Sequence, residues 1–464
     1  MTKPSSRQIF ALPASALPSG WSQAPLSELA QLIRGVVYQK DKARDKPQPG
    51  YIPILRAANI QEEGLILGQN LVFAPEKEVK PEQLLQPGDV VICMSSGSRE
   101  LVGKAAPLEE PWRGACGAFC AVVRFKSGFE PKWGRYFFRS DNYRRLIQAA
   151  AAGVNINNLR YDALAQLRLP VPPLGEQQRL VALIEHYFHR IDAGVTALRR
   201  AQAKLQNYRA AVLEAAVSGR LVAQDPADES AAALLGRLRG ERSSQAALFE
   251  PLPDLPPLAQ GWTWARLAAI ADALGGYAFK SRDFSASGLQ IVKIANVERG
   301  RLNLAERPTF INQVEGRIKE KYRLQPGDLL ISLTGTRRKR DYGFVALVQD
   351  ETGLLLNQRV ARLRFHAPLN PHFFELILQG NHFRNRFFAY ETGNVGQGNV
   401  RIAAIIQEAV PVPPLAEQAR IVSAVGQRFA AVERIETVIE TNLRRARALG
   451  QAILERTFSG RLSE

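Results

Sequence analysis

The stretch PVPPLGEQ, residues 170–177, returns with one change as PVPPLAEQ, residues 411–418. The offset is 411 − 170 = 241, and it is shared by Gly-Trp at 20–21 and 261–262 and by Ser-Gly-Arg-Leu at 218–221 and 459–462. Weaker echoes follow nearby offsets: Gln-Pro-Gly-Asp at 86–89 and 325–328, and Ala-Asn at 58–59 and 295–296. Three motifs at one offset predict an internal repeat, so that the chain consists of two copies of one unit of about 240 residues.

Between these motifs the two copies differ in sequence. The difference is greatest at residues 29–49 and 274–288 and after each Pro-Gly-Asp. A repeated scaffold with dissimilar loops is what two readers of two different targets need. The repeat therefore favours two recognition domains with separate specificities.

Size and charge narrow the class of protein. The chain has 464 residues, 46% of them hydrophobic, which is enough for more than one domain core. A net charge of +17 and a pI near 10.0 indicate a polyanionic partner: DNA first, with RNA and acidic membranes open at this point. No apolar run reaches the roughly 20 residues of a membrane span and no signal peptide is recognisable, so we expect a cytoplasmic protein without a membrane partner.

Metal and disulfide sites are not expected. Cys93, Cys116 and Cys120 are too few for a disulfide framework and lack a second pair for zinc, so we interpret them as buried structural thiols. His186 and His189 stand three apart on an expected helix, but no third ligand completes a site. We interpret both as solvated helix residues.

A long helix is predicted after each Pro-Pro-Leu. Proline suits the first turn of a helix, and Glu176 and Glu417 suit its positive end. Apolar residues then recur every seven positions, which is typical of a coiled coil, although many such helices are only packing elements. The helix-packing positions are Ile184, Ile191, Leu198, Leu205 and Val212 in the first copy, and Val425, Val432, Ile439, Ala446 and Ile453 in the second.

Gly219 and Gly460 stand where a helix ends in a left-handed residue. Each helix would then contain about 45 residues and measure about 65 to 70 Å. Packed antiparallel, the two helices would act as a spacer between domains in a pseudo-twofold arrangement. The predicted divisions are a first recognition domain at 1–172, a central helix at 173–221, a linker at 222–258, a second recognition domain at 259–413 and a C-terminal helix at 414–464.

The remainder of each copy alternates short strands with a helix near 131–152 or 371–390, which predicts α+β domains. Each Pro-Gly-Asp turn precedes a strand whose far end carries hydroxyl, glycine and basic residues, suited to phosphates and to guanine. Such loops are often merely solvated, but their matching positions favour DNA contact. These candidates are Ser95, Ser96, Ser98 and Arg99, and then Thr334, Thr336, Arg337, Arg338, Lys339 and Arg340.

Further candidates for DNA contact lie in two other kinds of loop. Amide side chains before each long helix suit adenine edges as well as turn formation. Tyr38 and Tyr342 suit either stacking on DNA or packing in a core. The basic loop candidates are Lys40, Lys42, Arg44, Lys46, Lys280 and Arg282, and the amide candidates are Asn155, Asn157, Asn158, Asn394, Gln397 and Asn399.

Catalytic signatures are not recognisable. The nearest approach to a phosphate-binding loop, Gly97 to Lys104, has the wrong spacing and no hydroxyl residue after the lysine. Neither an Asn/Asp-Pro-Pro-aromatic tetrapeptide nor a glycine-rich cofactor loop is found. We therefore expect a non-catalytic chain without its own cofactor or metal.

The duplicated Pro-Val-Pro-Pro-Leu-x-Glu-Gln, the Gly-Trp openings and the Ser-Gly-Arg-Leu closings resemble the specificity subunits of type I restriction-modification enzymes, over nearly the whole chain. The resemblance implies a subunit that recognises a bipartite, asymmetric double-stranded DNA site, one domain for each half. It also implies two adenine-methylating subunits that use S-adenosylmethionine, and restriction subunits that use ATP and Mg²⁺. The alternatives are a stand-alone DNA-binding regulator or architectural protein and, less in keeping with the missing motifs, a fused nuclease or methyltransferase.

Overall fold

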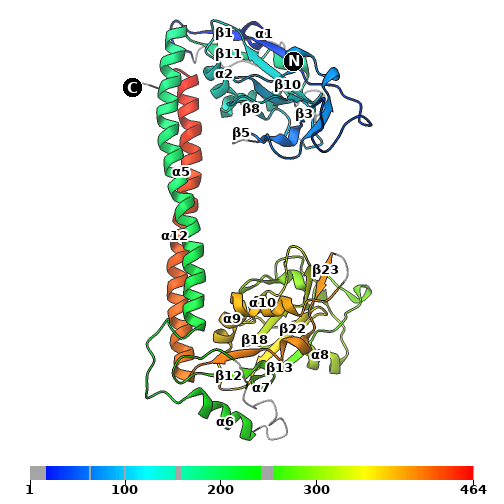
Figure 1. Cartoon of the computed structure of the whole chain (residues 1–464), viewed down its shortest axis with the longest axis vertical. Coiled ribbons are helices and arrows are strands. Elements are labelled where there is room, and N and C mark those ends of the chain that lie inside the picture. The colour runs from blue at the N-terminus through cyan, green and yellow to red at the C-terminus, as the bar shows by residue number, and fades with distance from the viewer. Residues whose placement is uncertain are drawn as a thin grey trace. The chain divides into compact units, whose positions relative to one another are not determined.

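The computed structural model describes residues 17–61, 64–98, 101–151, 158–241, 252, 255–393 and 396–462. The chain divides into two compact units (Figure 1). The first unit contains residues 1–200 and 439–464, and the second contains residues 201–438. No helix among the described residues is long and apolar enough to cross a membrane.

The first unit is built on four small sheets, one of which is the pair of β4 with β5. A four-stranded sheet has the order β2-β10-β7-β8, a three-stranded sheet has the order β6-β3-β9, and β1 pairs with β11. The strands are β1 (Ser22–Pro25), β2 (Ala30–Arg34), β3 (Tyr51–Leu55), β4 (Ile60–Gln61), β5 (Gly64–Leu65), β6 (Val72–Pro75), β7 (Val90–Cys93), β8 (Ala105–Pro107), β9 (Ala115–Cys116), β10 (Cys120–Phe125) and β11 (Arg168–Val171). The shorter helices are α1 (Leu26–Leu29), α2 (Pro131–Phe138), α3 (Asp141–Ala151) and α4 (Tyr161–Ala165).

The second unit repeats this topology. Its sheets have the orders β13-β22-β18-β20, β17-β14-β21 and β12-β24, with two further pairs: β15 with β16, and β19 with β23, which is described below. The strands are β12 (Thr263–Arg266), β13 (Ala271–Gly275), β14 (Leu289–Val292), β15 (Val297–Glu298), β16 (Arg301–Leu302), β17 (Phe310–Ile311), β18 (Asp328–Ser332), β19 (Thr334–Thr336), β20 (Val345–Leu347), β21 (Leu354–Leu356), β22 (Val360–Phe365), β23 (Gln397–Asn399) and β24 (Ala409–Val412). The shorter helices are α7 (Leu267–Ile270), α8 (Gly316–Tyr322), α9 (Pro371–Gln379), α10 (Asn381–Ala389) and α11 (Ile402–Ile405). The prediction of duplicated α+β domains is confirmed.

The single helix expected near 131–152 and near 371–390 is in each copy two helices. In the first unit, α2 and α3 meet at Ser140, whose hydroxyl accepts the N–H of Tyr143 at 3.3 Å. In the second, Gly380 has an extended backbone (φ −64°, ψ 151°) between α9 and α10. A helical pattern in the sequence does not reveal such a break, because apolar residues continue on both sides of it.

The repeated glutamine joins the long helix to the domain. Gln177 accepts the N–H of Glu130 at 3.0 Å and donates to the carbonyl of Pro172 at 2.8 Å. Gln418 does the same with Asn370 at 3.0 Å and Pro413 at 3.0 Å. Both glutamines are buried, so these bonds fix the first turn of each long helix to the start of α2 or α9.

The two long helices are α5 (Leu174–Val217) and α12 (Leu415–Phe458). Both pass from one unit into the other along the chain, and in each unit they pack antiparallel (Figure 1). In the first unit, Ile184 and Ile453 share one core; in the second, Val212 and Val425 share another. Of the remaining heptad positions, Val432 and Ile439 are buried, and Ile191, Leu198, Leu205 and Ala446 are half-buried.

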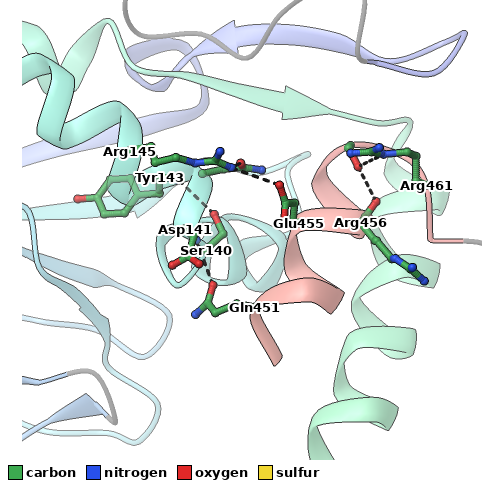
Figure 2. Close-up of polar contacts among 10 residues, drawn as sticks. Ser140, Asp141, Tyr143, Arg145, Gln451, Glu455, Arg456 and Arg461 are labelled. Atoms are coloured by element: carbon green, nitrogen blue, oxygen red, sulfur yellow. Dashed lines mark hydrogen bonds and ion pairs between the residues drawn. The ribbon is translucent and has the colours of Figure 1, made fainter. Parts of the chain in front are cut away.

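Both helices end in the same way. Gly219 and Gly460 have positive φ values of 69° and 67°, and the next N–H bonds back five residues, from Arg220 to Ala215 and from Arg461 to Arg456. Near the end of α12, Gln451 accepts the N–H of Asp141 at 3.1 Å (Figure 2). The glycine with positive φ and the arginine N–H that bonds back five residues explain the Ser-Gly-Arg-Leu repeat as the C-terminal cap of each long helix.

The segment expected to be a plain linker contains a helix, α6 (Ala231–Glu241). Leu234, Leu235 and Leu238 on this helix are buried in the core of the second unit. Asp228, just before α6, pairs with Arg420 of α12, with its Oδ2 2.5 Å from Nη2. Residues 228–241 of this segment are therefore packed into the second unit.

Candidate nucleic-acid interface

A buried ion pair holds each Pro-Gly-Asp turn. Asp89 accepts the N–H of Gln86 at 2.8 Å and two hydrogen bonds from Arg124, at 2.9 and 2.7 Å. In the second unit, Asp328 accepts the N–H of Gln325 at 2.7 Å and two bonds from Arg364. The turn, the strand after it (β7 or β18) and the central strand (β10 or β22) are therefore fixed together, which determines where the following loop starts.

In the second unit, the hydroxyl loop and the amide loop are brought together. Strands β19 and β23 pair antiparallel, with Thr334 opposite Asn399 and Thr336 opposite Gln397. Thr334 is buried, whereas Thr336 and Gln397 are exposed. Two contact segments that the sequence predicted, about 60 residues apart in the chain, thus form one two-stranded ribbon.

The basic run after Thr336 lies at the end of this ribbon. Arg337 pairs with Glu391 at 2.8 Å between Nε and Oε2, and the guanidinium of Arg340 lies 4.9 Å from the Phe388 ring centre. Arg338 and Lys339 are exposed. Since all four keep exposed side chains, the run forms a positive surface next to the ribbon.

Tyr342 packs in a core. Its ring is buried against Phe387 and Phe388, and its hydroxyl donates to Glu391. Burial and the hydrogen bond to Glu391 both raise the pKa of Tyr342, so the phenol remains a neutral donor at physiological pH. Tyr38 is half-buried and packs against the core of Val36, Ile52 and Ile54.

The first unit shows the same juxtaposition in reduced form. Ser95 forms an antiparallel bridge with Asn158, and the Ser96 hydroxyl accepts the N–H of Ser98 at 3.2 Å. Ser98 and Asn158 are exposed. The candidates Arg99, Asn155, Asn157 and Asn394 lie outside the described residues.

The remaining basic candidates occupy loops that precede β3 and β14. In the first unit, Arg44 bonds the carbonyls of Asp41 and Ala43 at 3.0 and 2.9 Å. In the second, Arg282 lies 3.7 Å from Asp283 between Nε and Oδ1. The candidates in these loops are all exposed: Lys40, Lys42, Arg44, Lys46, Lys280 and Arg282.

One element of this surface was missed in the sequence. A tight turn at 117–120 in the first unit, and at 357–360 in the second, lies against the start of the hydroxyl loop. The carbonyl of Phe119 accepts the N–H of Met94 at 2.8 Å, and that of Arg359 accepts the N–H of Leu333 at 2.8 Å. The two turns have no residue in common at equivalent positions, so the repeat does not reveal them. Only their matching places, directly before β10 and β22, could have identified them from the sequence.

The thiols are chemically quiet. Cys93, Cys116 and Cys120 are free and buried. Burial raises the pKa of Cys93 to about 11 and that of Cys116 to about 12, and it raises the pKa of Cys120 as well. Among the residues that the structure describes, no group of three or more His, Cys, Asp or Glu side chains could hold a metal ion.

Comparisons with known proteins converge on one family. Residues 18–198 match the family described as "Type I restriction modification DNA specificity domain". The chain is 30% identical to the type I restriction enzyme StySPI specificity subunit of Salmonella potsdam, over 96% of this chain and 90% of that one. It is also 30% identical to the EcoKI specificity subunit of Escherichia coli K12, over 97% and 91% of the two chains.

A solved structure supports the fold. A chain in a study titled "Structural basis underlying complex assembly and conformational transition of the type I R-M system" aligns with a TM-score of 0.65 at 20% identity, over 96% of this chain and 99% of that chain. The near full-length sequence matches at 30% identity show that the chain belongs to the specificity subunits of type I restriction enzymes.

Proposed function

We propose that this chain selects the DNA sequence for a type I restriction-modification complex, with each unit contacting one half of a bipartite, asymmetric site. The observation that carries this proposal is the duplicated meeting of a hydroxyl loop and an amide loop, with Ser95 beside Asn158 and Thr334 beside Asn399. One scaffold thus presents two chemically different surfaces. Different surfaces on one repeat suit two different half-sites.

In this proposal the recognition domains comprise residues 1–172 and 259–413, and the long helices determine the length of the unspecified spacer. The basic runs neutralise phosphates, and the amide and arginine side chains contact base edges. The net charge of +17 supports an electrostatic contribution of this kind.

Catalysis is assigned to partner subunits. We propose two methylation subunits, which transfer a methyl group from S-adenosylmethionine to adenine N6, and restriction subunits that use ATP and Mg²⁺. This chain then contributes target choice and no reacting group. We place the complex in the cytoplasm, where the target DNA lies.

The test is to co-express the chain with a methylation subunit of a type I system from the same genome and to map adenine methylation across the host genome by single-molecule sequencing. A gapped, non-palindromic methylated motif that disappears on deletion of this chain supports the proposal. A palindromic motif, or methylation that persists without the chain, refutes it and favours a stand-alone regulator.

A domain exchange tests the division of labour. Replacing residues 29–170 with the equivalent part of a relative should change one half of the methylated motif and leave the other half unchanged. A change in both halves would contradict the assignment of one half-site to each unit. Exchange of residues 270–411, its counterpart in the second copy (29 + 241 and 170 + 241), is the matched control and should change the opposite half.

A further inference from the structure

A tight turn begins the central strand of each unit. Its closing hydrogen bond runs from the N–H of Cys120 to the carbonyl of Gly117 at 2.8 Å, and in the second unit from Val360 to Asn357 at 3.2 Å. The third residue is Phe119 in one turn and Arg359 in the other. The two turns thus present different chemistry at the same place in the fold.

Each turn is joined to both predicted contact loops. In the first unit, the carbonyl of Phe119 accepts N–H groups of Met94 at 2.8 Å and Ser95 at 3.2 Å, while the Met94 carbonyl accepts the N–H of Leu159 at 2.7 Å. In the second, Leu333 bonds the Arg359 carbonyl and accepts the N–H of Val400 at 2.9 Å. Turn, hydroxyl loop and amide loop therefore form one hydrogen-bonded platform.

The residue that follows β2 or β13 packs closely against the turn and restricts its backbone. A Cβ atom on Gly35 would lie 2.0 Å from the carbonyl oxygen of Gly117, and one on Gly276 would lie 1.9 Å from that of Asn357. Only glycine permits this approach of the backbones. The turn backbone is thus preorganised, while its third side chain projects from it.

The side chain in the first unit is apolar and uncovered. The ring of Phe119 is 69% exposed, and the neighbouring Val37 is 80% exposed. Val36 bridges Gly117, which places Val37 beside the turn. Folding leaves this apolar pair in water, whereas contact with a partner would bury it.

The side chain in the second unit is cationic and unengaged. Arg359 is exposed, and its guanidinium forms no hydrogen bond or ion pair with any other residue in the described ranges. Its backbone has φ 70°, a conformation that a non-glycine residue adopts at some cost in energy. The two bonded ends of the turn hold it there, with the guanidinium free to donate.

We infer that this turn position is a specificity determinant in each unit: Phe119, beside Val37, contacts a thymine methyl group in the first half-site, and Arg359 donates two hydrogen bonds to N7 and O6 of a guanine in the second. Apolar side chains suit thymine C5-methyl groups, and arginine suits guanine in the major groove. The inference rests on the proposed function and adds to it which side chains discriminate.

Base analogues test the inference directly. The chain is purified with its methylation subunits. Binding is measured on unmethylated duplexes that contain the sequence motif identified by methylation mapping. Deoxyuridine replaces each thymine of the first half-site in turn, which removes one methyl group. The analogue 7-deazaguanine replaces each guanine of the second half-site in turn, which removes the N7 acceptor.

One thymine and one guanine should respond. Phe119→Ala should weaken binding to the unmodified duplex and abolish the response to deoxyuridine at a single position. Arg359→Ala should weaken binding about 5- to 150-fold and abolish the response to 7-deazaguanine at a single position. Phe119→Leu, which keeps an apolar contact, should retain part of the first response, and Arg359→Lys should lose most of the second.

Arg307→Ala is the matched control, because Arg307 is an exposed arginine in the second unit with φ 47°. It should leave every analogue response intact. If Phe119→Ala and Arg359→Ala keep the wild-type analogue responses, or weaken binding equally on all duplexes, the inference is overturned while the proposed function stands. If the wild-type complex shows no bipartite methylation that depends on this chain, the proposed function itself fails.

Discussion

Arg364 donates from Nε and Nη2 to the two carboxylate oxygens of Asp328, at 2.6 and 2.7 Å, and so fixes the central strand β22 to the Pro-Gly-Asp turn before β18. Asp328 is fully buried, whereas a third of the Arg364 side chain is exposed. Asp89 and Arg124 repeat the arrangement in the first unit. Because both units contain this pair in the same geometry, it determines where each recognition loop begins.

Asp328→Ala should therefore lower the free energy of unfolding by about 3 kcal/mol, because it leaves a half-buried guanidinium and a turn N–H without their buried acceptor. Urea unfolding followed by circular dichroism measures the loss. Arg301→Ala, which removes an exposed pair with Glu298, is the control and should leave the free energy of unfolding nearly unchanged. Equal losses in the two variants would contradict a special role for the buried pair.

Two glycine-to-alanine replacements should change the stability of the second unit in opposite directions. Gly219→Ala places a Cβ atom 2.5 Å from the Cβ of Ala259 at a residue with φ 69°, so it should destabilise the second unit by at least about 1 kcal/mol. Gly236 lies exposed in α6 with nothing within 4 Å of the added atom, so Gly236→Ala should stabilise by about 0.5 to 1 kcal/mol. Thermal melting curves compare them, and a stabilised Gly219→Ala would refute the C-terminal cap.

A cavity in the second unit borders a position at which the first unit has a longer side chain. In the first, Gln451 accepts the N–H of Asp141 at 3.1 Å (Figure 2). The same side chain donates to the carbonyl of Arg139 at 3.1 Å. The repeat places Ala210 at the equivalent position (451 − 210 = 241), where it lines a cavity of about 290 Å³ together with Gln379 and Asn381.

Ala210→Gln should reach the Gln379 carbonyl and the Asn381 N–H and raise the free energy of unfolding by about 1 kcal/mol. Gln451→Ala is the reciprocal variant and should lose a similar amount. Chemical denaturation of both gives the comparison. A destabilised Ala210→Gln would show that the second unit cannot accept the bonds of the first.

Glu375 should make stability depend on pH. Burial raises the pKa of this carboxyl to about 7, while its carboxylate accepts the N–H of Leu347 at 3.2 Å. Between the ordinary pKa near 4.5 and about 7, the folded chain holds a proton that the unfolded chain releases. The free energy of unfolding should therefore fall as pH rises through this window, by at most about 3 kcal/mol from this residue.

Glu375→Gln should remove that fall, because the amide keeps an acceptor for Leu347 and never ionises. The variant should be more stable than wild type at pH 8 and nearly equal to it at pH 4. Urea unfolding at a series of pH values measures the difference, with the exposed Glu440→Gln as control. A difference that does not change with pH would rule out Glu375 as its source.

Local features of the structure were predicted well from the sequence. Proline after the last strand and glycine at 219 and 460 mark the ends of the long helices, because capping depends on neighbours within a few residues. The duplicated α+β fold follows from motifs that keep one offset. The sequence did not predict α6, whose Leu234, Leu235 and Leu238 are buried in the core of the second unit.

The sequence by itself determined the duplication, the two helices and the segments that carry polar and basic side chains. Only the tertiary structure decided which of those segments meet. Thr334 lies opposite Asn399, and the turn of Phe119 lies against Met94, through hydrogen bonds between strands far apart in the chain. Backbone pairing of this kind does not depend on side-chain identity, so the residue types at these positions do not predict it.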